Sequence, residues 1–159
     1  MKNIIKTVLL LFTIGVFMVS CDEGGDPDSG GTEIENVAGE WVVNITRDGA
    51  DFSHGHISTY NTAANTTSEM WLDDLESGWG LKSKVNLNLE TLSFSGTDLP
   101  ELYYDVTVTV TDGKIIKNGA TAPSGTITDA ISFTAVFSDV PTRVFVYSGY
   151  KRTGFLEDE

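Results

Sequence analysis

Apolar and polar residues alternate with a period of two through most of the chain after residue 38. In residues 39–47, Trp41, Val43 and Ile45 fall on one face of an extended segment. The polar residues of this segment fall on the other face: Glu40, Asn44 and Thr46. This period is typical of a β-strand that is buried on one side only. Since no segment of the domain carries an apolar stripe of helical spacing, the sequence predicts an all-β fold.

Further segments of this kind follow, separated by short turns. With the first, the predicted strands cover residues 39–47, 57–62, 69–73, 81–90, 91–96, 103–111, 114–117, 130–137 and 143–152. Strands at this spacing predict either a β-sandwich or an up-and-down barrel. Asp112-Gly113 is the strongest hairpin signal, whereas residues 50–56 are predicted to be a polar loop. An eight-stranded barrel would leave no exposed edges, and its interior is either filled or holds one small ligand.

The first twenty residues have the composition of a signal peptide. Lys2 and Lys6 accompany an apolar run that is short for a membrane span and ends in small residues. The sequence from Met18 to Cys21 resembles a bacterial lipobox, in which cleavage precedes the cysteine and its sulfur is acylated. We therefore predict a lipoprotein signal peptide at residues 1–20 and lipid attachment at Cys21, the only cysteine. The alternative is an ordinary signal peptide with an incidental cysteine.

Residues 21–36 are acidic, rich in glycine and almost free of apolar side chains, so we expect a flexible tether before a domain at 37–159. Acidic residues directly after an acylated cysteine resemble the surface-export signal of lipoproteins in some Gram-negative bacteria. A plain solvated linker has the same composition. The expected location is therefore the outer membrane, with exposure at the cell surface left open.

The formal net charge is −13, and loss of the two leader lysines would make it −15. Such a charge argues against electrostatic binding of nucleic acid or anionic lipid. It does not argue against an apolar ligand held in a cavity. We expect no cofactor, and the sequence leaves the oligomeric state open.

Gly39-Glu40-Trp41 resembles the Gly-X-Trp motif that begins the first strand of lipocalins. In that fold an arginine near the end of the last strand packs over the tryptophan and closes the base of the barrel. The resemblance therefore implies barrel closure by Trp41 and Arg152, with Lys151 beside the arginine in sequence. A guanidinium on an indole ring contributes about 0.5–2 kcal/mol.

A broader resemblance is to the lipid-binding putative hydrolases, a family of small lipocalin-like bacterial lipoproteins. The segments that carry it are Ala38–Trp41, Thr59–Thr62, Met70–Asp74, Asp112–Ile116, Pro123–Gly125 and Ser148–Phe155. The resemblance implies a single antiparallel, lipocalin-like up-and-down barrel of about eight strands that binds lipid. The family name suggests hydrolysis but brings no catalytic residue. Two positions depart from the family pattern, since Ala130 stands where a serine is expected and Lys151 where an arginine is expected.

The two histidines are the only weak candidates for a metal site. His54 and His56 would face the same way on a strand, and with a third ligand such as Asp73 they could bind zinc. The simpler interpretation is that both face water in a polar loop, and we predict no metal site. Asp73 and Asp74 are neighbours, so on a strand they should point to opposite faces rather than share a proton.

Five aromatic residues are the candidate ligand-binding side chains: Tyr60, Trp71, Tyr104, Phe133 and Tyr147. Many predicted inward positions are small or β-branched. The lining could therefore leave room for an acyl chain or a molecule of steroid size. The alternative is that the same residues pack the barrel shut.

The leading functional hypothesis is a lipid-anchored cell-envelope protein that binds a small apolar or amphipathic ligand, such as a lipid, inside the barrel. A second hypothesis is an esterase-like hydrolase of lipid or acyl substrates, with Ser53 or Ser58 near a histidine. The chain lacks a Gly-X-Ser-X-Gly motif, and the catalytic residues stay unknown. A third is a non-catalytic surface component that docks a glycan or a protein through exposed aromatics such as Trp79.

Overall fold

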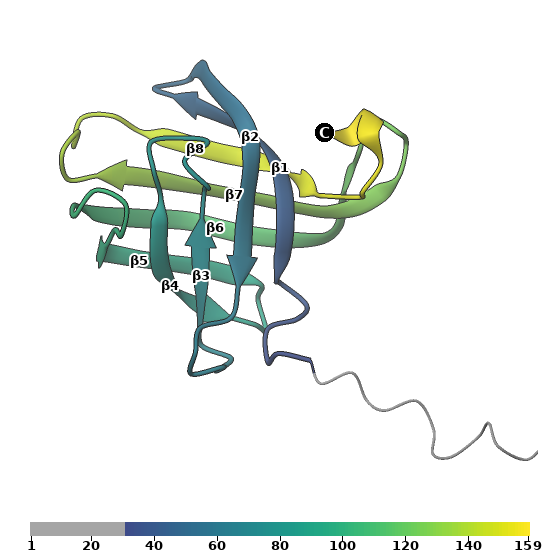
Figure 1. Cartoon of the computed structure of the whole chain (residues 1–159), viewed down its shortest axis with the longest axis horizontal. Coiled ribbons are helices and arrows are strands. Elements are labelled where there is room, and N and C mark those ends of the chain that lie inside the picture. Colours follow the sequence, from purple (N-terminus) through teal and green to yellow (C-terminus); the bar gives the residue numbers. More distant parts are fainter. Residues whose placement is uncertain (1–30) are drawn as a thin grey trace, which may run out of the picture. The chain divides into compact units, whose positions relative to one another are not determined.

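Eight antiparallel strands close into a barrel within residues 31–159, the part of the chain that this computed structural model describes (Figure 1). The strands are β1 (Gly39–Arg47), β2 (Ala50–Tyr60), β3 (Glu69–Asp73), β4 (Lys82–Asn88), β5 (Ser93–Pro100), β6 (Thr107–Thr121), β7 (Ile127–Phe137) and β8 (Phe145–Lys151). Each strand pairs with the next along the chain, and β1 also pairs with β8. The predicted lipocalin-like up-and-down barrel is therefore confirmed, and the sandwich is excluded.

Burial alternates along the strands as the sequence pattern predicts. Along β4, Ser83, Val85 and Leu87 are buried, while the residues between them face outward. Alternation gives every strand an apolar inner face, because successive side chains point to opposite sides of the sheet. The inner faces together form one core.

Two parts of the strand prediction are wrong. Residues 50–56, predicted to be a loop, belong to β2. Asp112-Gly113 and Asn118-Gly119 do not end strands, because β6 runs through both dipeptides. Asp112 and Asn118 have φ of 55° and 53°, and the β6–β7 register shifts at both places. A residue with a left-handed backbone conformation suits a β-bulge as well as a hairpin turn. The two dipeptides therefore bend one long strand instead of ending it.

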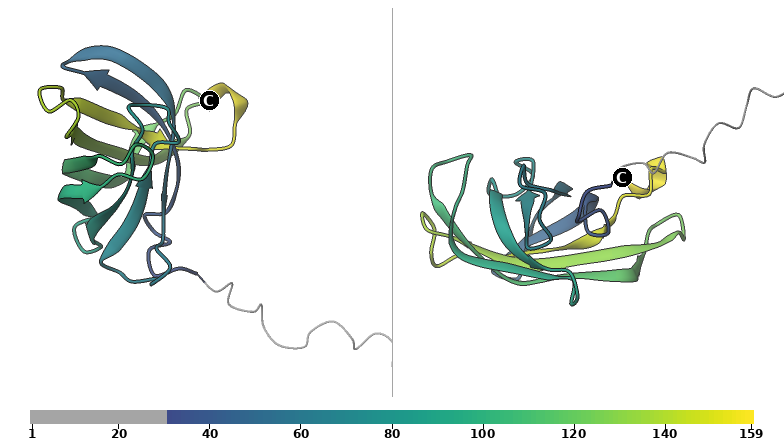
Figure 2. Two further views of the ribbon diagram at one scale, coloured as in Figure 1. Left: turned by 60° about the vertical axis from the view of Figure 1, so that its left-hand side comes forward. Right: turned by 90° about the horizontal axis from the view of Figure 1, so that it is seen from below.

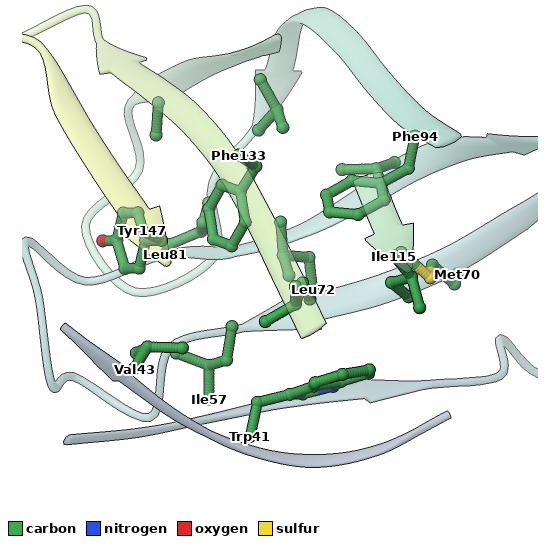
Figure 3. Close-up of a cluster of buried hydrophobic side chains, with 14 of the residues drawn as sticks. Trp41, Val43, Ile57, Met70, Leu72, Leu81, Phe94, Ile115, Phe133 and Tyr147 are labelled. Carbon is green, nitrogen blue, oxygen red and sulfur yellow. The ribbon is translucent and has the colours of Figure 1, made fainter. Parts of the chain in front are cut away.

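The barrel interior is filled by large side chains (Figure 3). Phe133 and Tyr147 stack with ring centroids 4.4 Å apart, and Phe94 lies 5.7 Å from Phe133. Trp41 is fully buried near the start of β1. The sequence left open whether the inward residues enclose a cavity or pack the barrel shut, and the structure shows a packed interior.

The folded domain begins before residue 37. Ile34 and Val37 are both fully buried and belong to the core. Val37 also accepts a hydrogen bond of 2.6 Å from the Thr59 hydroxyl, which in turn accepts one of 2.9 Å from Trp41 Nε1. The domain therefore includes Ile34, and the tether predicted for residues 21–36 ends before that residue. The predicted signal peptide and Cys21 lie outside the described residues.

The C-terminal residues fold back beside the tip of the long β6–β7 hairpin, as Figures 1 and 2 show. They end in a short 3₁₀ helix, η1 (Leu156–Asp158). Asp158 is 1% exposed and accepts hydrogen bonds from the Ser124 amide at 2.6 Å and the Thr153 hydroxyl at 2.5 Å. Glu159 pairs with His56 across 3.0 Å. The acidic C-terminal end thus makes an ordered contact with the barrel.

We expect this C-terminal contact to loosen in acid. Burial alone would raise the pKa of Asp158, but hydrogen bonds from Thr153 and Ser124 outweigh it and hold the pKa below its ordinary value. Because the folded pKa is the lower one, the contact stabilises the fold above about pH 4 and is lost as pH falls through the folded pKa. At neutral pH, Asp158→Asn should speed hydrogen exchange of the Ser124 amide about tenfold. Equal exchange in both proteins at neutral pH would contradict this expectation.

Candidate functional site

The up-and-down topology places four of the seven strand connections at one end of the barrel and three at the other. We call the end that holds the start of β1 and Trp41 the base. The opposite end, the mouth, is formed by the β1–β2 turn and the β3–β4, β5–β6 and β7–β8 loops, which cover residues 74–81, 101–106 and 138–144. Loops carried on a rigid barrel are common positions for binding residues. The mouth is therefore the first place to look for a site.

A cluster of aromatic rings closes the mouth. Phe52 of β2, Trp79 of the β3–β4 loop and Phe145 of β8 lie with ring centroids 5.6–6.4 Å apart. Phe137 adds an edge contact to Phe145 at 5.5 Å. Phe145 is fully buried, whereas Phe52 and Trp79 are only partly buried and pack on the core from outside. The apolar interior is thus continuous with a partly exposed aromatic surface.

Asp74 fixes the β3–β4 loop to the barrel. Its side chain is fully buried and accepts hydrogen bonds from the amides of Leu81 at 2.8 Å and Glu76 at 3.0 Å, and more weakly from Gly80 at 3.3 Å. Tyr147 donates its hydroxyl to the same carboxylate at 3.0 Å. Burial raises the pKa of Asp74, and these hydrogen bonds oppose the shift. One carboxylate therefore ties the loop to a residue of the inner core.

The β3–β4 loop is strained and lies beside a small pocket. Leu75 and Glu76 have φ of 50° and 59°, which is unusual for residues with a side chain. A pocket of about 250 Å³ is lined by Trp79, Tyr104 and Asp139. The indole Nε1 of Trp79 donates to Asp139 at 3.2 Å. The loop is therefore held by a few polar contacts above the packed apolar core.

Asp73 points to the outer face of the barrel, so it and its neighbour Asp74 lie on opposite faces of the sheet as predicted. Asp73 is 2% exposed, pairs with Lys82 at 2.9 Å, and accepts the hydroxyls of Tyr60 at 2.9 Å and Tyr103 at 2.6 Å. Burial would raise the pKa of Asp73, but the hydrogen bond from Lys82 and those from the tyrosines lower it overall. This satisfied network joins β2, β3, β4 and the β5–β6 loop, and it has the character of a structural contact.

The structure does not bring the five predicted ligand-binding aromatics together. Phe133 and Tyr147 lie in the core, and Tyr104 lies at the mouth and is 58% exposed. Tyr60 and Trp71 stack on each other at 6.4 Å on the outer face. The outward direction follows from strand parity, because the alternate residues of β3, Met70 and Leu72, are the buried ones.

Three mouth residues escaped the sequence reasoning. Phe52 lies in the segment predicted to be a loop, and Phe145 lies in the predicted strand at residues 143–152 without being a candidate ligand-binding residue. Asp74 was considered only as a partner of Asp73. The signal that could have found Asp74 is its position directly after a strand, where an acidic side chain often accepts amide hydrogen bonds from the following turn.

At the base, the cation over Trp41 is Lys151 rather than Arg152. Lys151 Nζ lies 5.8 Å from the centre of the Trp41 ring. Arg152 instead pairs with Glu40 at 2.8 Å and Glu159 at 2.7 Å. The strand register explains why the lysine, and not the arginine, covers the ring. Lys151 is directly opposite Trp41 in the β1–β8 pairing, and the side chain of the next residue, Arg152, must point to the other face of the sheet.

Within residues 31–159, no hydrogen bond joins the ring of His54 or His56 to a serine hydroxyl. His54 Nδ1 contacts the Asn44 amide oxygen at 2.9 Å, whereas His56 pairs with Glu159. Ser53 donates its hydroxyl to the Ser77 carbonyl at 2.6 Å, and as a strand neighbour of His54 it faces the opposite side. Within residues 31–159, no group of three or more His, Cys, Asp and Glu side chains could hold a metal ion.

Larger hollows lie on the outer face of the barrel. One of about 410 Å³ spreads over β1, β6, β7 and β8, with Asn44, Ser132, Ser148 and Tyr150 in its lining. Another of about 440 Å³ adjoins Asn44 and His54. Both are open to solvent. Ile116, Ala130 and Ile131 also line the first, whereas Asp51 and Ser53 also line the second. They do not offer the apolar enclosure that a lipid chain requires.

Fold and site together define a lipocalin-like closed barrel whose apolar core reaches an aromatic mouth. The sequence profile of the lipid-binding putative hydrolase family matches residues 26–156, and the chain therefore belongs to that family. A search of curated proteins finds no match. Among the described residues, no helix has the length and apolarity needed to cross a membrane.

Proposed function

We propose that this protein binds a lipid through the mouth of its barrel. The observation that carries the proposal is the continuity between the fully apolar core and the partly exposed rings of Phe52 and Trp79. The family to which the chain belongs is described as lipid-binding, which supports the same function. An acyl chain entering here would exchange water for aromatic and aliphatic surface, with about 0.8 kcal/mol gained per buried methylene.

Entry requires movement, because the interior is packed. Trp79 of the β3–β4 loop is only partly buried, and the loop already carries two strained residues, Leu75 and Glu76. Segments of this kind open at lower cost than the barrel strands. The loop moves outward with Trp79, and the acyl chain takes the place of the rings that fill the mouth.

The test uses tryptophan emission and mass spectrometry on the full-length protein. Lipid extracted from the purified protein should be detectable, and an added long-chain amphiphile should change the emission. Trp79→Phe should remove most of this change, because Trp79 is the tryptophan at the mouth. Trp71→Phe, on the outer face, is the matched control and should preserve it. Unchanged emission with every amphiphile, together with no extracted lipid, would overturn the proposal.

The anchoring part of the proposal rests on the leader and Cys21. The protein is held at the outer membrane by acyl chains on this cysteine, and several chains on one residue give a lasting anchor. The barrel would then face either the periplasm or the cell surface at the end of a short acidic tether.

Cys21→Ser is expected to move the protein from the membrane fraction to the soluble fraction, because the thiol that accepts the acyl group is gone. Fractionation and immunoblotting measure this change. Labelling of intact cells with a reagent that does not cross membranes separates the two orientations. Full retention of Cys21→Ser in the membrane fraction would contradict the anchor.

A further inference from the structure

We propose that Asp74 makes the mouth selective for lipids with an uncharged or cationic head group, and against free fatty acids. This inference rests on the proposed lipid binding at the mouth, and it names the chemical class of ligand. Its basis is a fully buried carboxylate that lies between the β3–β4 loop and the aromatic core.

The hydrogen-bond partners of Asp74 identify its charge state. All are donors: the amides of Glu76, Gly80 and Leu81 and the hydroxyl of Tyr147. An ionised carboxylate accepts on both oxygens and donates nothing. A protonated one would donate its O–H to the Tyr147 hydroxyl, which would then need another acceptor for its own proton, and within residues 31–159 this hydroxyl donates to Asp74 alone. The geometry therefore fits the negatively charged form.

No ion pair within residues 31–159 involves this carboxylate, and the guanidinium of Arg47 at the mouth lies over the Phe52 ring, 4.7 Å from its centre. Lys82 pairs with Asp73 on the outer face. The adjoining pocket adds a second acid, because Asp139 lines it. A carboxylate head group near this position would be repelled, and the repulsion is strong where apolar side chains exclude water.

Asp74 lies close to the route by which a chain would reach the core. Tyr147, its hydroxyl partner, stacks on Phe133 at 4.4 Å deep in the barrel. A Cβ atom on Gly78 of the β3–β4 loop would stand 2.3 Å from the Tyr147 hydroxyl and 2.7 Å from the Asp74 carboxylate, so the loop backbone packs directly over both groups. When the loop moves outward, this pair is the first polar group below it.

The same pair can serve an uncharged head group. An alcohol or amide can donate a hydrogen bond to the Asp74 carboxylate in place of Tyr147, and the freed Tyr147 hydroxyl can donate to the ligand's oxygen. An ammonium group would gain from the charge as well. A fatty acid carboxylate has no proton to donate to Asp74. The two negative charges would repel each other, and Asp74 would lose a hydrogen bond that the ligand could not replace.

The test compares a long-chain alcohol, the amine and the fatty acid of the same chain length, titrated above neutral pH into the full-length protein. We expect the alcohol and the amine to bind at least about tenfold more tightly than the fatty acid. Equal or tighter binding of the fatty acid would overturn the inference while leaving the proposed lipid binding intact. Absence of binding by all three would overturn the proposed function itself.

Asp74→Asn tests the residue, and Asp73→Asn is its matched control. Both are buried carboxylates that accept several hydrogen bonds, but they point to opposite faces of the sheet. The preference for alcohol over fatty acid should fall severalfold in Asp74→Asn and persist in Asp73→Asn. An unchanged preference in a folded Asp74→Asn would overturn the assignment. Should that variant fail to fold, the amine comparison in the natural protein still decides the question.

Discussion

Replacing Trp41 with alanine is expected to lower the free energy of unfolding by about 3–5 kcal/mol. The indole is fully buried at the base of the barrel and contacts elements distant in sequence. Its Nε1 donates to Thr59 of β2 at 2.9 Å, and Lys151 of β8 lies over its ring. Alanine would leave a cavity where three strands meet, and the Thr59 hydroxyl would lose a donor. Chemical denaturation measures the change.

Trp71→Ala is the control for this prediction. Trp71 also lies on a strand, but it is partly exposed on the outer face and stacks only on Tyr60, with Lys84 over its ring at 5.6 Å. Its loss removes less buried area, and we expect a cost of about 1 kcal/mol. An equal loss of unfolding free energy in the two variants would contradict the expectation that Trp41 closes the base of the barrel.

Gly149→Ala is expected to destabilise the barrel by about 3 kcal/mol or more. Gly149 is the β8 residue opposite Val43 of β1 and Ile131 of β7, so it lies on the seam that closes the sheet. A Cβ atom there would stand 1.9 Å from the Val42 carbonyl oxygen and 2.7 Å from the Val43 Cα. These are backbone atoms that cannot rotate away, so the strands would have to separate. Thermal and denaturant unfolding should both show the loss.

The adjacent substitution Ser148→Ala gives the matched comparison. Ser148 is exposed on the outer face of the same strand, one residue from the seam glycine. A surface change of this kind should alter the free energy of unfolding by no more than about 0.5 kcal/mol. A Gly149→Ala protein as stable as Ser148→Ala would mean that β1 and β8 can move apart without cost, contrary to their paired register.

The functional argument depends on the contrast between the two ends of the barrel. The base is held by the buried Trp41 and by Ile34 and Val37, which enter from the N-terminal side. The mouth is covered by partly buried rings and by a loop whose main fixed point is Asp74. Opening is therefore expected at the mouth, where the covering rings of Phe52 and Trp79 are only partly buried.

The local pattern of apolar and polar residues was sufficient to predict the class of fold and the direction in which several side chains point. The period of two placed Trp41, Val43 and Ile45 inside, and it separated Asp73 from Asp74 correctly. The pattern gave a wrong prediction where the same short sequence is compatible with two different local structures. Asp112-Gly113 suits a hairpin turn and a β-bulge equally, and only pairing with β7 along the full length of β6 favours the bulge.

The sequence by itself determined an all-β chain with one wet and one apolar face per strand, and its motifs pointed to a lipocalin-like barrel. Only the tertiary structure decided that Tyr60 and Trp71 face outward and that Lys151 covers Trp41. It also decided that Asp158 is buried against Ser124 and that Asp74 bonds Tyr147. The physical reason is range. Alternation fixes relative directions within one strand, whereas these contacts join residues as far apart in the sequence as Trp41 and Lys151 and depend on strand register and barrel closure.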